Sequence, residues 1–439
     1  MALRKDFIEM KEDAPFPDVW VPLSDSLRVL AGLAPFDKQM AHDPALELTS
    51  KSVTLTRAST ATYIDKAGVL KTAAINEPRF EKEGLLIEGK SSNILLNSTD
   101  PTKWNSSSSL TKTVIAADGA TQTITCKGVV NLAAAISNFV TSGNITATAG
   151  ECLTLSCRAK GAYGLLRLAF TQDGTTTSVV FFDAVTGVLH GNLPTDVTVT
   201  TSLGVDGYAT ISATLTTPAD GTYVGFITVA KAAADSVIPV GSEFYVQMPQ
   251  CEKNAVATSY IPTGSAAVTR ATDVCTLQRY GNDNYFGPVT FSAEIHLNGK
   301  TNADGAMTSR RGIISAKPSS TESYTLMLAT SGANAGKPCF GYGNSDFVYG
   351  STGLDDGKGH VVVARFDGSD KYLCSDGVMS VGRAATKPAS GNVDATNQNI
   401  QIGYGAGYVT PGHSVLNGHI RNIRIWHRAL NDRQIKGIR

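Results

Sequence analysis

The chain carries little charge, and its charges cancel. Of 439 residues only 17% are charged, with 38 basic side chains against 38 acidic ones. A neutral chain has no overall electrostatic attraction for nucleic acids or anionic membranes. No run approaches the roughly 20 apolar residues that a membrane-spanning helix needs. We therefore expect no nucleic-acid partner and no membrane insertion, so any ligand must be recognised by a local site.

The cysteine patterns of a zinc site or a disulfide framework are also missing. The seven cysteines are odd in number and include no C-x-x-C pair, and no histidine flanks them at zinc-binding spacing. The first twenty residues lack the apolar core of a secretion signal. This usage is typical of reduced cysteines in a protein that folds in a cytoplasm.

Motifs of common hydrolases are absent as well. The sequence has no H-E-x-x-H and no G-x-S-x-G. No pair of carboxylates can be assigned as a glycosidase acid and base, because strand spacing does not show which ones face each other. We expect no enzyme activity and no cofactor. Asp355 and Asp356 offer loop oxygens to Ca²⁺ or simply belong to a solvated loop, so a calcium site is not assignable.

What the sequence does contain is short alternating segments rich in Thr, Val, Ser and Gly. Examples are Leu153–Cys157, Ala209–Leu215 and Val361–Phe366, and Asp-Gly steps separate many such runs. These features predict β-strands joined by hairpin turns. One helical signal stands near the end, where Asn431 as N-cap and Gln434 three residues later approach a capping box.

A phosphate-binding spelling, G-x-x-x-x-G-K-[ST], runs from Gly84 to Ser91. A working phosphate loop needs a tight turn followed by a helix. Here the intervening residues include Leu85, Leu86 and Ile87, which favour a strand, and the sequence downstream predicts no helix. We interpret residues 85–88 as a strand closed by a Gly-Lys-Ser turn, and we expect no nucleotide binding.

Composition divides the chain into four parts. They are an irregular, proline-interrupted arm (1–50), a β-rich connector (51–95), a strand-rich unit (96–275) and a second strand-rich unit (285–439). A short echo, Leu55–Ser59 against Val268–Thr272, flanks the middle unit. We interpret it as similar strands on either side of that unit.

Tyrosines beside glycines are the candidate ligand contacts. Such rings stack on the apolar faces of sugars, while neighbouring polar groups take the hydroxyls. The alternative is that the rings pack at strand ends or in a subunit interface. The candidate glycan-binding residues are Tyr342, Tyr349, Tyr404, Tyr408 and His413.

Three stretches carry a resemblance to known families. TLTRASTATYIDKAG at residues 54–68 and INEPRFEKEGLLIEGKSSNIL at 75–95 resemble a segment of tailed-bacteriophage tail-fibre and related virion proteins. In that segment the residue at Lys90 varies, so the phosphate-binding spelling arises by chance. The middle unit resembles a carbohydrate-binding-type jelly roll, and Tyr208 fits an aromatic position of such domains. Residues 285–439 resemble a laminin-G or concanavalin A-like sandwich, above all in their ending, Leu416–Asp432.

These resemblances imply an all-β fold, with two tandem β-sandwich (jelly-roll) domains preceded by an irregular N-terminal virion-docking arm. They imply a receptor-binding fibre or tail protein of a phage virion, made in the host bacterial cytoplasm and placed on the tail or another external appendage. Residues 1–50 would bind other virion proteins, and the sandwiches would bind host cell-surface polysaccharide during adsorption. Such proteins are commonly homotrimers.

Two alternatives remain open. The protein is also compatible with a structural capsid-decoration, collar or tail component whose lectin-like domains mediate packing. A polysaccharide depolymerase is less favoured, because the sequence shows neither a long solenoid repeat nor an identifiable acid pair.

Overall fold

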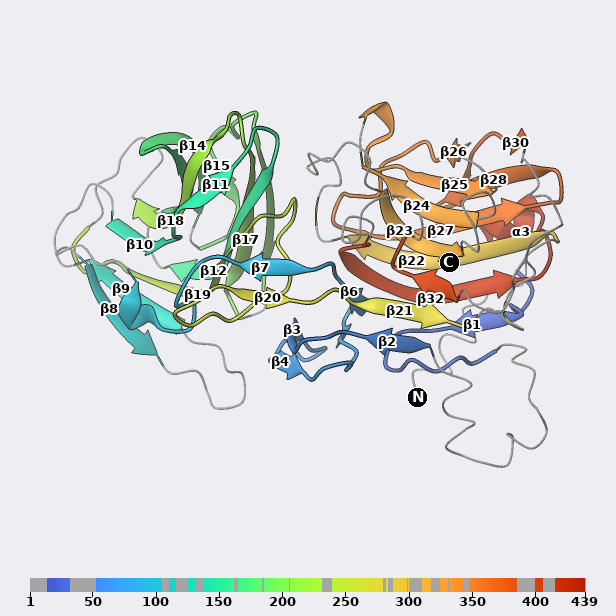
Figure 1. Cartoon of the computed structure of the whole chain (residues 1–439), viewed down its shortest axis with the longest axis horizontal. Coiled ribbons are helices and arrows are strands. Elements are labelled where there is room, and N and C mark those ends of the chain that lie inside the picture. Colours follow the sequence, from blue (N-terminus) through green and yellow to red (C-terminus); the bar gives the residue numbers. More distant parts are fainter. Residues whose placement is uncertain are drawn as a thin grey trace.

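A computed structural model places most of the chain in β-strands. The residues that it describes are 14–31, 53–104, 110–115, 125–130, 137–161, 165–183, 185–204, 206–230, 239–278, 282, 287–297, 299, 310–316, 324–330, 332–342, 347–384, 399–405 and 415–438. Two β-sandwiches lie side by side (Figure 1). The all-β prediction is confirmed.

The larger sandwich pairs a nine-stranded sheet with a seven-stranded sheet. The first has the order β29-β28-β27-β22-β32-β6-β5, with β1 added on β32 and β30 on β28. Its strands are β1 (Val19–Val21), β5 (Phe80–Glu81), β6 (Gly84–Ile87), β22 (Val289–Leu297), β27 (Gly359–Phe366), β28 (Asp370–Ser375), β29 (Val378–Met379), β30 (Arg383–Ala384) and β32 (Gly418–Trp426). The second has the order β2-β21-β31-β23-β24-β25-β26. Its strands are β2 (Thr54–Thr56), β21 (Val274–Leu277), β23 (Arg310–Ala316), β24 (Tyr324–Ala329), β25 (Pro338–Tyr342), β26 (Phe347–Tyr349) and β31 (Ile400–Ile402).

Apolar side chains from both sheets fill the space between them. Phe291 of β22 and Tyr324 of β24 stack with ring centroids 4.5 Å apart, and Ile425 of β32 belongs to the same buried cluster. Burying such side chains on one face of each strand is the main favourable contribution to folding.

One edge of β32 is shared by two segments from the first hundred residues. β6 pairs with its beginning, Gly418 to Ile420, and β1 pairs with its end, Ile423 to Ile425. The indole Nε1 of Trp426 also donates to the Pro15 carbonyl at 2.8 Å. Residues 14–31 are thus attached to the sandwich, in contrast to the irregular arm expected over 1–50, because β1 pairs with a strand about 400 residues away and bonds to Ala31 on its other side.

The smaller sandwich contains two six-stranded sheets. One has the order β10-β18-β13-β14-β15 with β11 on β18, and the other has the order β16-β17-β12-β19-β9-β8. The first comprises β10 (Ser137–Thr141), β11 (Ile145–Ala147), β13 (Leu165–Gln172), β14 (Thr175–Asp183), β15 (Leu189–His190) and β18 (Gly221–Ala230). The second comprises β8 (Leu110–Ile115), β9 (Thr125–Val130), β12 (Cys152–Gly161), β16 (Val197–Leu203), β17 (Ala209–Thr216) and β19 (Glu243–Glu252). A separate core cluster lies between these sheets.

The smaller sandwich is inserted into the larger one. β7 (Ser91–Asn93) leads into it and pairs with β20 (Val268–Arg270), which leads out of it (Figure 1). Before and after the insertion, β2 pairs with β21 inside the larger sandwich. The two domains are therefore nested rather than strictly tandem, and the segments expected to be a connector supply strands to the larger sandwich.

The predicted turn and cap chemistry is present. Asp173 and Gly174 both have positive φ, 48° and 83°, between β13 and β14, as a two-residue hairpin turn requires. α3 (Asp432–Lys436) begins after Asn431, which forms the complete capping box with Gln434. The remaining described elements are the hairpin of β3 (Ala61–Ile64) with β4 (Leu70–Ala73) and the 3-10 turns η2 (Pro101–Lys103) and η3 (Gly332–Asn334). No helix in the described ranges is long and apolar enough to cross a membrane.

Candidate functional site

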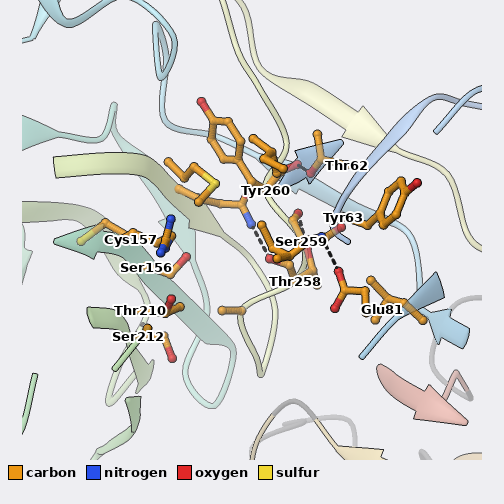
Figure 2. A pocket seen from close by; sticks show the side chains of 18 of the residues that line it. Thr62, Tyr63, Glu81, Ser156, Cys157, Thr210, Ser212, Thr258, Ser259 and Tyr260 are labelled. Carbon is orange, nitrogen blue, oxygen red and sulfur yellow. Dashed lines mark hydrogen bonds between the residues drawn. The ribbon is translucent and has the colours of Figure 1, made fainter. Parts of the chain in front are cut away.

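A cleft of about 580 Å³ opens between the two sandwiches (Figure 2). Three parts of the chain enclose it: the outer face of β12, β16, β17 and β19, the β3–β4 hairpin, and the segment 257–260 together with β6. Its volume lies within the range of about 300–1,000 Å³ that is usual for ligand pockets.

The wall supplied by the smaller sandwich is polar because its strands alternate. Successive residues of a strand face opposite sides, and the inward ones, such as Leu155 and Ile211, lie in the core. The outward ones carry hydroxyl, amide or guanidinium groups; they are Ser156, Arg158, Thr200, Thr210, Ser212 and Gln250. The hydroxyls of Thr200 and Ser212 lie 2.6 Å apart in a hydrogen bond.

One end of this wall is organised around Arg158. Its Nη2 donates to both carboxylate oxygens of Asp206, at 3.0 and 2.8 Å, and its Nη1 donates to Gln247 at 3.1 Å. The guanidinium lies 5.3 Å from the ring centroid of Tyr208. Burial alone would raise the pKa of Asp206, but the hydrogen bond and charge of Arg158 outweigh it and lower the pKa. Asp206 is thus held ionised beside a fixed cation and an aromatic ring.

The opposite wall comes from the β3–β4 hairpin. Figure 2 shows Tyr63 and Glu81 across the cleft from Ser156 and Thr210. The backbone N–H of Ile64 donates to Glu81 at 2.7 Å, which fixes that carboxylate against the hairpin. Burial, followed by the charge of Glu77, raises the pKa of Tyr63, so its phenol stays protonated and able to donate.

Beneath the cleft lies a buried ionic network centred on Glu88 and Asp273. Glu88 Oε2 accepts from Arg79 at 2.7 Å and from Arg270 at 2.6 Å, while Asp273 accepts from Arg79 and from Arg57. All five side chains are at most 1% exposed. These residues come from before and after the inserted domain, so the network holds together the two chain segments that lead into and out of it.

Ser259 adds the inserted domain to this network. Its backbone N–H and its hydroxyl each donate to Glu88 at 2.7 Å. Burial alone would raise the pKa of Glu88, but Arg270, Arg79 and Ser259 outweigh it and lower the pKa to about 2. Glu88 is therefore a structural anion rather than a proton donor to the cleft.

The phosphate-binding spelling belongs to the same junction. β6 confirms the expected strand, and its hydrogen-bonded continuation is β7 rather than a helix. The backbone N–H groups of Glu88, Gly89 and Lys90 donate to side chains of Asp273, Asn417 and Thr272, at 2.9, 2.8 and 2.9 Å. A phosphate loop needs those N–H groups to be free for the ligand. Here all three are bonded to side chains of the protein, so they are not available to bind a phosphate.

The predicted tyrosines do not gather in one place. Tyr349 packs on a small apolar cluster with Met327 and Cys339, and Tyr404 packs against the main core of the larger sandwich. Three strands separate β26, which carries Tyr349, from β31, which ends two residues before Tyr404, so at about 4.8 Å per step the two strands are roughly 19 Å apart. Tyr342 ends β25 opposite Tyr324. Tyr408 and His413 lie outside the described residues, and the glycan-binding role of this set stays a prediction.

The cleft residues were not identified from the sequence as a site. The segments LTLSCR in β12 and ATISATL in β17 indicated strands, and their outward Ser, Thr and Arg side chains were not assigned a function. The available signal was that every second residue was small and hydroxylated on two strands that pair with each other. Tyr208, whose ring lies beside Arg158 of the wall, was singled out through its place after Asp206 and Gly207.

Comparison with known proteins supports the fold of the larger sandwich. Residues 269–436 match the Concanavalin A-like lectin/glucanases superfamily, in a laminin G family. The match begins at β20 and β21, where the chain returns from the inserted domain. The predicted laminin-G or concanavalin A-like sandwich is therefore confirmed for this domain. No curated protein matches the chain.

Several solved structures are similar at low identity. A CBM40 domain of a Ruminococcus gnavus sialidase, bound to α2,3-sialyllactose, is 12% identical over 35% of this chain and 83% of that one, with a TM-score of 0.27. Mouse laminin α1 domains LG4–5 are 14% identical over 66% and 90%, with a TM-score of 0.24. A Trypanosoma rangeli sialidase in complex with sialic acid is 10% identical over 87% and 97%, with a TM-score of 0.27. Similarity at this level transfers neither a ligand nor an activity to this chain.

Proposed function

We propose that the protein binds glycans and that the cleft between its sandwiches is the binding site. The observation that carries this proposal is the cleft wall, which presents hydroxyl, amide and guanidinium groups in regular rows. A saccharide offers many hydroxyls that both donate and accept hydrogen bonds, and such a wall can satisfy them. The lectin-like fold of the larger sandwich gives further support.

The carboxylates of the cleft favour binding over hydrolysis. A glycosidase needs one carboxylic acid whose pKa is raised so that it can protonate the leaving oxygen. The described carboxylates that line the cleft are Glu81, Glu88 and Asp206. Arginine neighbours lower the pKa of Glu88 and of Asp206. Glu81 accepts from the backbone of Ile64 and lies 2.8 Å from the His419 imidazole. Asp206 is exposed and can accept hydrogen bonds from sugar hydroxyls, whereas the oxygens of buried Glu88 already accept from Arg79, Arg270 and Ser259. We therefore propose a binding protein rather than a depolymerase.

For the biological setting we propose a phage virion appendage that adsorbs to host-surface polysaccharide. The support is the resemblance of residues 54–68 and 75–95 to tail-fibre and related virion proteins. The virion location, the homotrimer and the attachment to other virion proteins through the N-terminal residues belong to this proposal. A trimer would present three clefts and multiply a weak affinity for each sugar.

A matched pair of substitutions tests the cleft. Thr210→Val removes one hydroxyl from the cleft wall without changing the shape of the side chain. Thr113→Val makes the same change on β8 of the same sheet, where the exposed threonine does not line the cleft. Binding of the labelled protein to a panel of bacterial surface polysaccharides is measured for both variants and for Tyr349→Ala.

We expect Thr210→Val to weaken binding by about fivefold, for the loss of one hydrogen bond worth about 1 kcal/mol. We expect Thr113→Val and Tyr349→Ala to bind like the unchanged protein. Loss of binding in Tyr349→Ala alone would move the site to the predicted tyrosines. Absence of binding to any polysaccharide by the folded protein would favour the structural capsid-decoration or collar component instead.

A further inference from the structure

We propose that Glu81, Glu83 and His419 bind a divalent transition metal ion at the edge of the cleft. One ligand atom from each residue lies within 4.8 Å of the other two. Sheet pairing brings them together, because Glu81 pairs with Gly84 in the β5–β6 hairpin and His419 pairs with Leu86 across β32 and β6. Two segments more than 330 residues apart therefore supply one ligand set.

The polar groups of this cluster are incompletely satisfied. His419 is 6% exposed, and its Nε2 lies 2.8 Å from Glu81 Oε2. Its Nδ1 is buried and has no hydrogen-bond partner. Nδ1 and Nε2 point in different directions, so an ion would bind through Nε2, in place of the proton between Nε2 and Glu81.

Glu83 is the second unsatisfied group. It is only partly exposed, and its carboxylate makes no hydrogen bond or ion pair with any residue that the structure describes. The nearest arginine on β32, Arg421, starts beside Gly84 but donates to Glu294 at 2.7 Å. Two carboxylates this close repel each other unless a cation lies between them.

A neighbouring imidazole extends the pattern. His296 pairs with His419 across β22 and β32, and the ring centroids are 5.8 Å apart. The Nδ1 of His296 is likewise buried without a partner, while its Nε2 lies 2.7 Å from the Gly357 carbonyl. Two adjacent imidazoles with empty nitrogens, beside two carboxylates, form an environment that favours a bound cation.

The donor set defines the class of metal. One imidazole nitrogen and two carboxylates suit Zn²⁺ or Mn²⁺ better than Ca²⁺, which prefers six to eight oxygens. Bond lengths near 2.1 Å require the three ligand atoms to be roughly 3–4 Å apart. The present separations of up to 4.8 Å reach that range through small side-chain movements.

Glu81 and His419 also line the cleft. An ion held by them would have open coordination positions for sugar hydroxyls, and this extension rests on the proposed function. Metal binding itself does not depend on a glycan, so it is measured first with metal alone.

The test is calorimetric titration of the full chain, free of any histidine tag, with ZnCl₂ and separately with MnCl₂. The variants are Glu83→Gln, His419→Gln and the control Asp25→Asn, which removes an exposed carboxylate elsewhere. Glu83→Gln is the decisive variant, because the Glu83 carboxylate makes no hydrogen bond or ion pair within the described part of the chain, so we expect its loss to leave the fold unchanged. Thermal unfolding with and without metal provides a second readout.

We expect one high-affinity site in the unchanged protein and in Asp25→Asn. We expect at least about tenfold weaker binding in Glu83→Gln, since even outer-shell partners of metal ligands contribute about 10–100-fold. Failure of both metals to bind, or equal affinity in Glu83→Gln, would overturn the proposal. Metal binding without any polysaccharide binding would uphold this site and reject the proposed function.

Discussion

Replacing Glu88 by glutamine removes the central charge of the buried network without changing the shape of the side chain. Arg79 would keep Asp273 as its partner, but the buried Arg270 would lose the carboxylate with which it pairs. A buried charge that loses its partner is strongly destabilising, because it cannot regain the solvation that it lost on folding. We therefore expect Glu88→Gln to destabilise the junction of the two sandwiches.

The structure gives the magnitude. The pKa of Glu88 falls from 4.5 to about 2 on folding, so its charged form is stabilised by about 3 kcal/mol, at 1.4 kcal/mol for each pH unit. Breaking a buried pair typically costs about 3–5 kcal/mol, which agrees. At about 2–4 °C per kcal/mol, the unfolding midpoint should fall by roughly 6–12 °C.

The pH dependence of stability provides a second test of the stabilisation by ionised Glu88. A depressed carboxyl pKa contributes stability that is complete above pH 4.5 and is lost as the pH falls toward 2. The unchanged protein should therefore lose stability across this window, and Glu88→Gln should lose less of it.

Differential scanning calorimetry at several pH values measures both effects. The control is Glu243→Gln, because Glu243 pairs with Lys127 at 2.5 Å on the surface, where ion pairs contribute little. A midpoint in Glu88→Gln equal to that of the control at pH 7 would show that desolvation cancels the attraction and would refute the reasoning.

Three further predictions follow from the same structure. Burial lowers the pKa of His360, but hydrogen bonds and charge from Asp376 and Asp356 outweigh it and raise the pKa above 6.5. The ion pairs of His360 should therefore stabilise the fold at low pH and weaken as the pH rises through the raised pKa. NMR titration of the imidazole measures this pKa, and a value below 6.5 would contradict the geometry. Replacing residues 94–267 by Asn-Gly should leave the larger sandwich folded by circular dichroism, because the paired strands β7 and β20 then form a hairpin; an unfolded product would show that the larger sandwich depends on its insertion. Deleting residues 1–31 should lower the unfolding midpoint by several degrees, because the deletion removes β1. A midpoint equal to that of the full chain would show that β1 contributes nothing.

Caps, turns and strands were predictable from the sequence wherever all the residues that determine them lie in one short segment. Asn431 and Gln434 are three residues apart, so the capping box could be predicted from the sequence, and the structure confirms it. The hairpin turns at Asp-Gly steps and the strands with alternating side chains were likewise predicted from local sequence. The carboxyl-terminal signature was also sufficient to identify the sandwich that ends the chain.

The cleft and the network were not predictable, because their members converge from distant segments. Arg57 and Arg270 stand in the echo TRAS and TRAT, which marked similar strands around the insertion. Both arginines donate to the acids beneath the cleft, Arg57 to Asp273 and Arg270 to Glu88. The repeated TRA motif was visible in the sequence, but the acids that pair with its two arginines were not. Sheet pairing between distant segments brings these residues together, and no local sequence pattern predicts that pairing.

The shared edge of β32 has a consequence for synthesis on the ribosome. β6 and β1 emerge early, but their pairing partner ends at Trp426, more than 330 residues after β6. At about 5–20 residues per second, β6 waits for β32 for roughly 20–70 seconds. The inserted sandwich has all of its strands within that interval and can fold first, which draws β7 and β20 together and shortens the loop that remains to be closed. Within the described residues, a chain truncated before β32 would leave β6 paired only with β5 and the backbone of β1 bonded only to residues 30 and 31, so the larger sandwich is complete only after β32 has been translated.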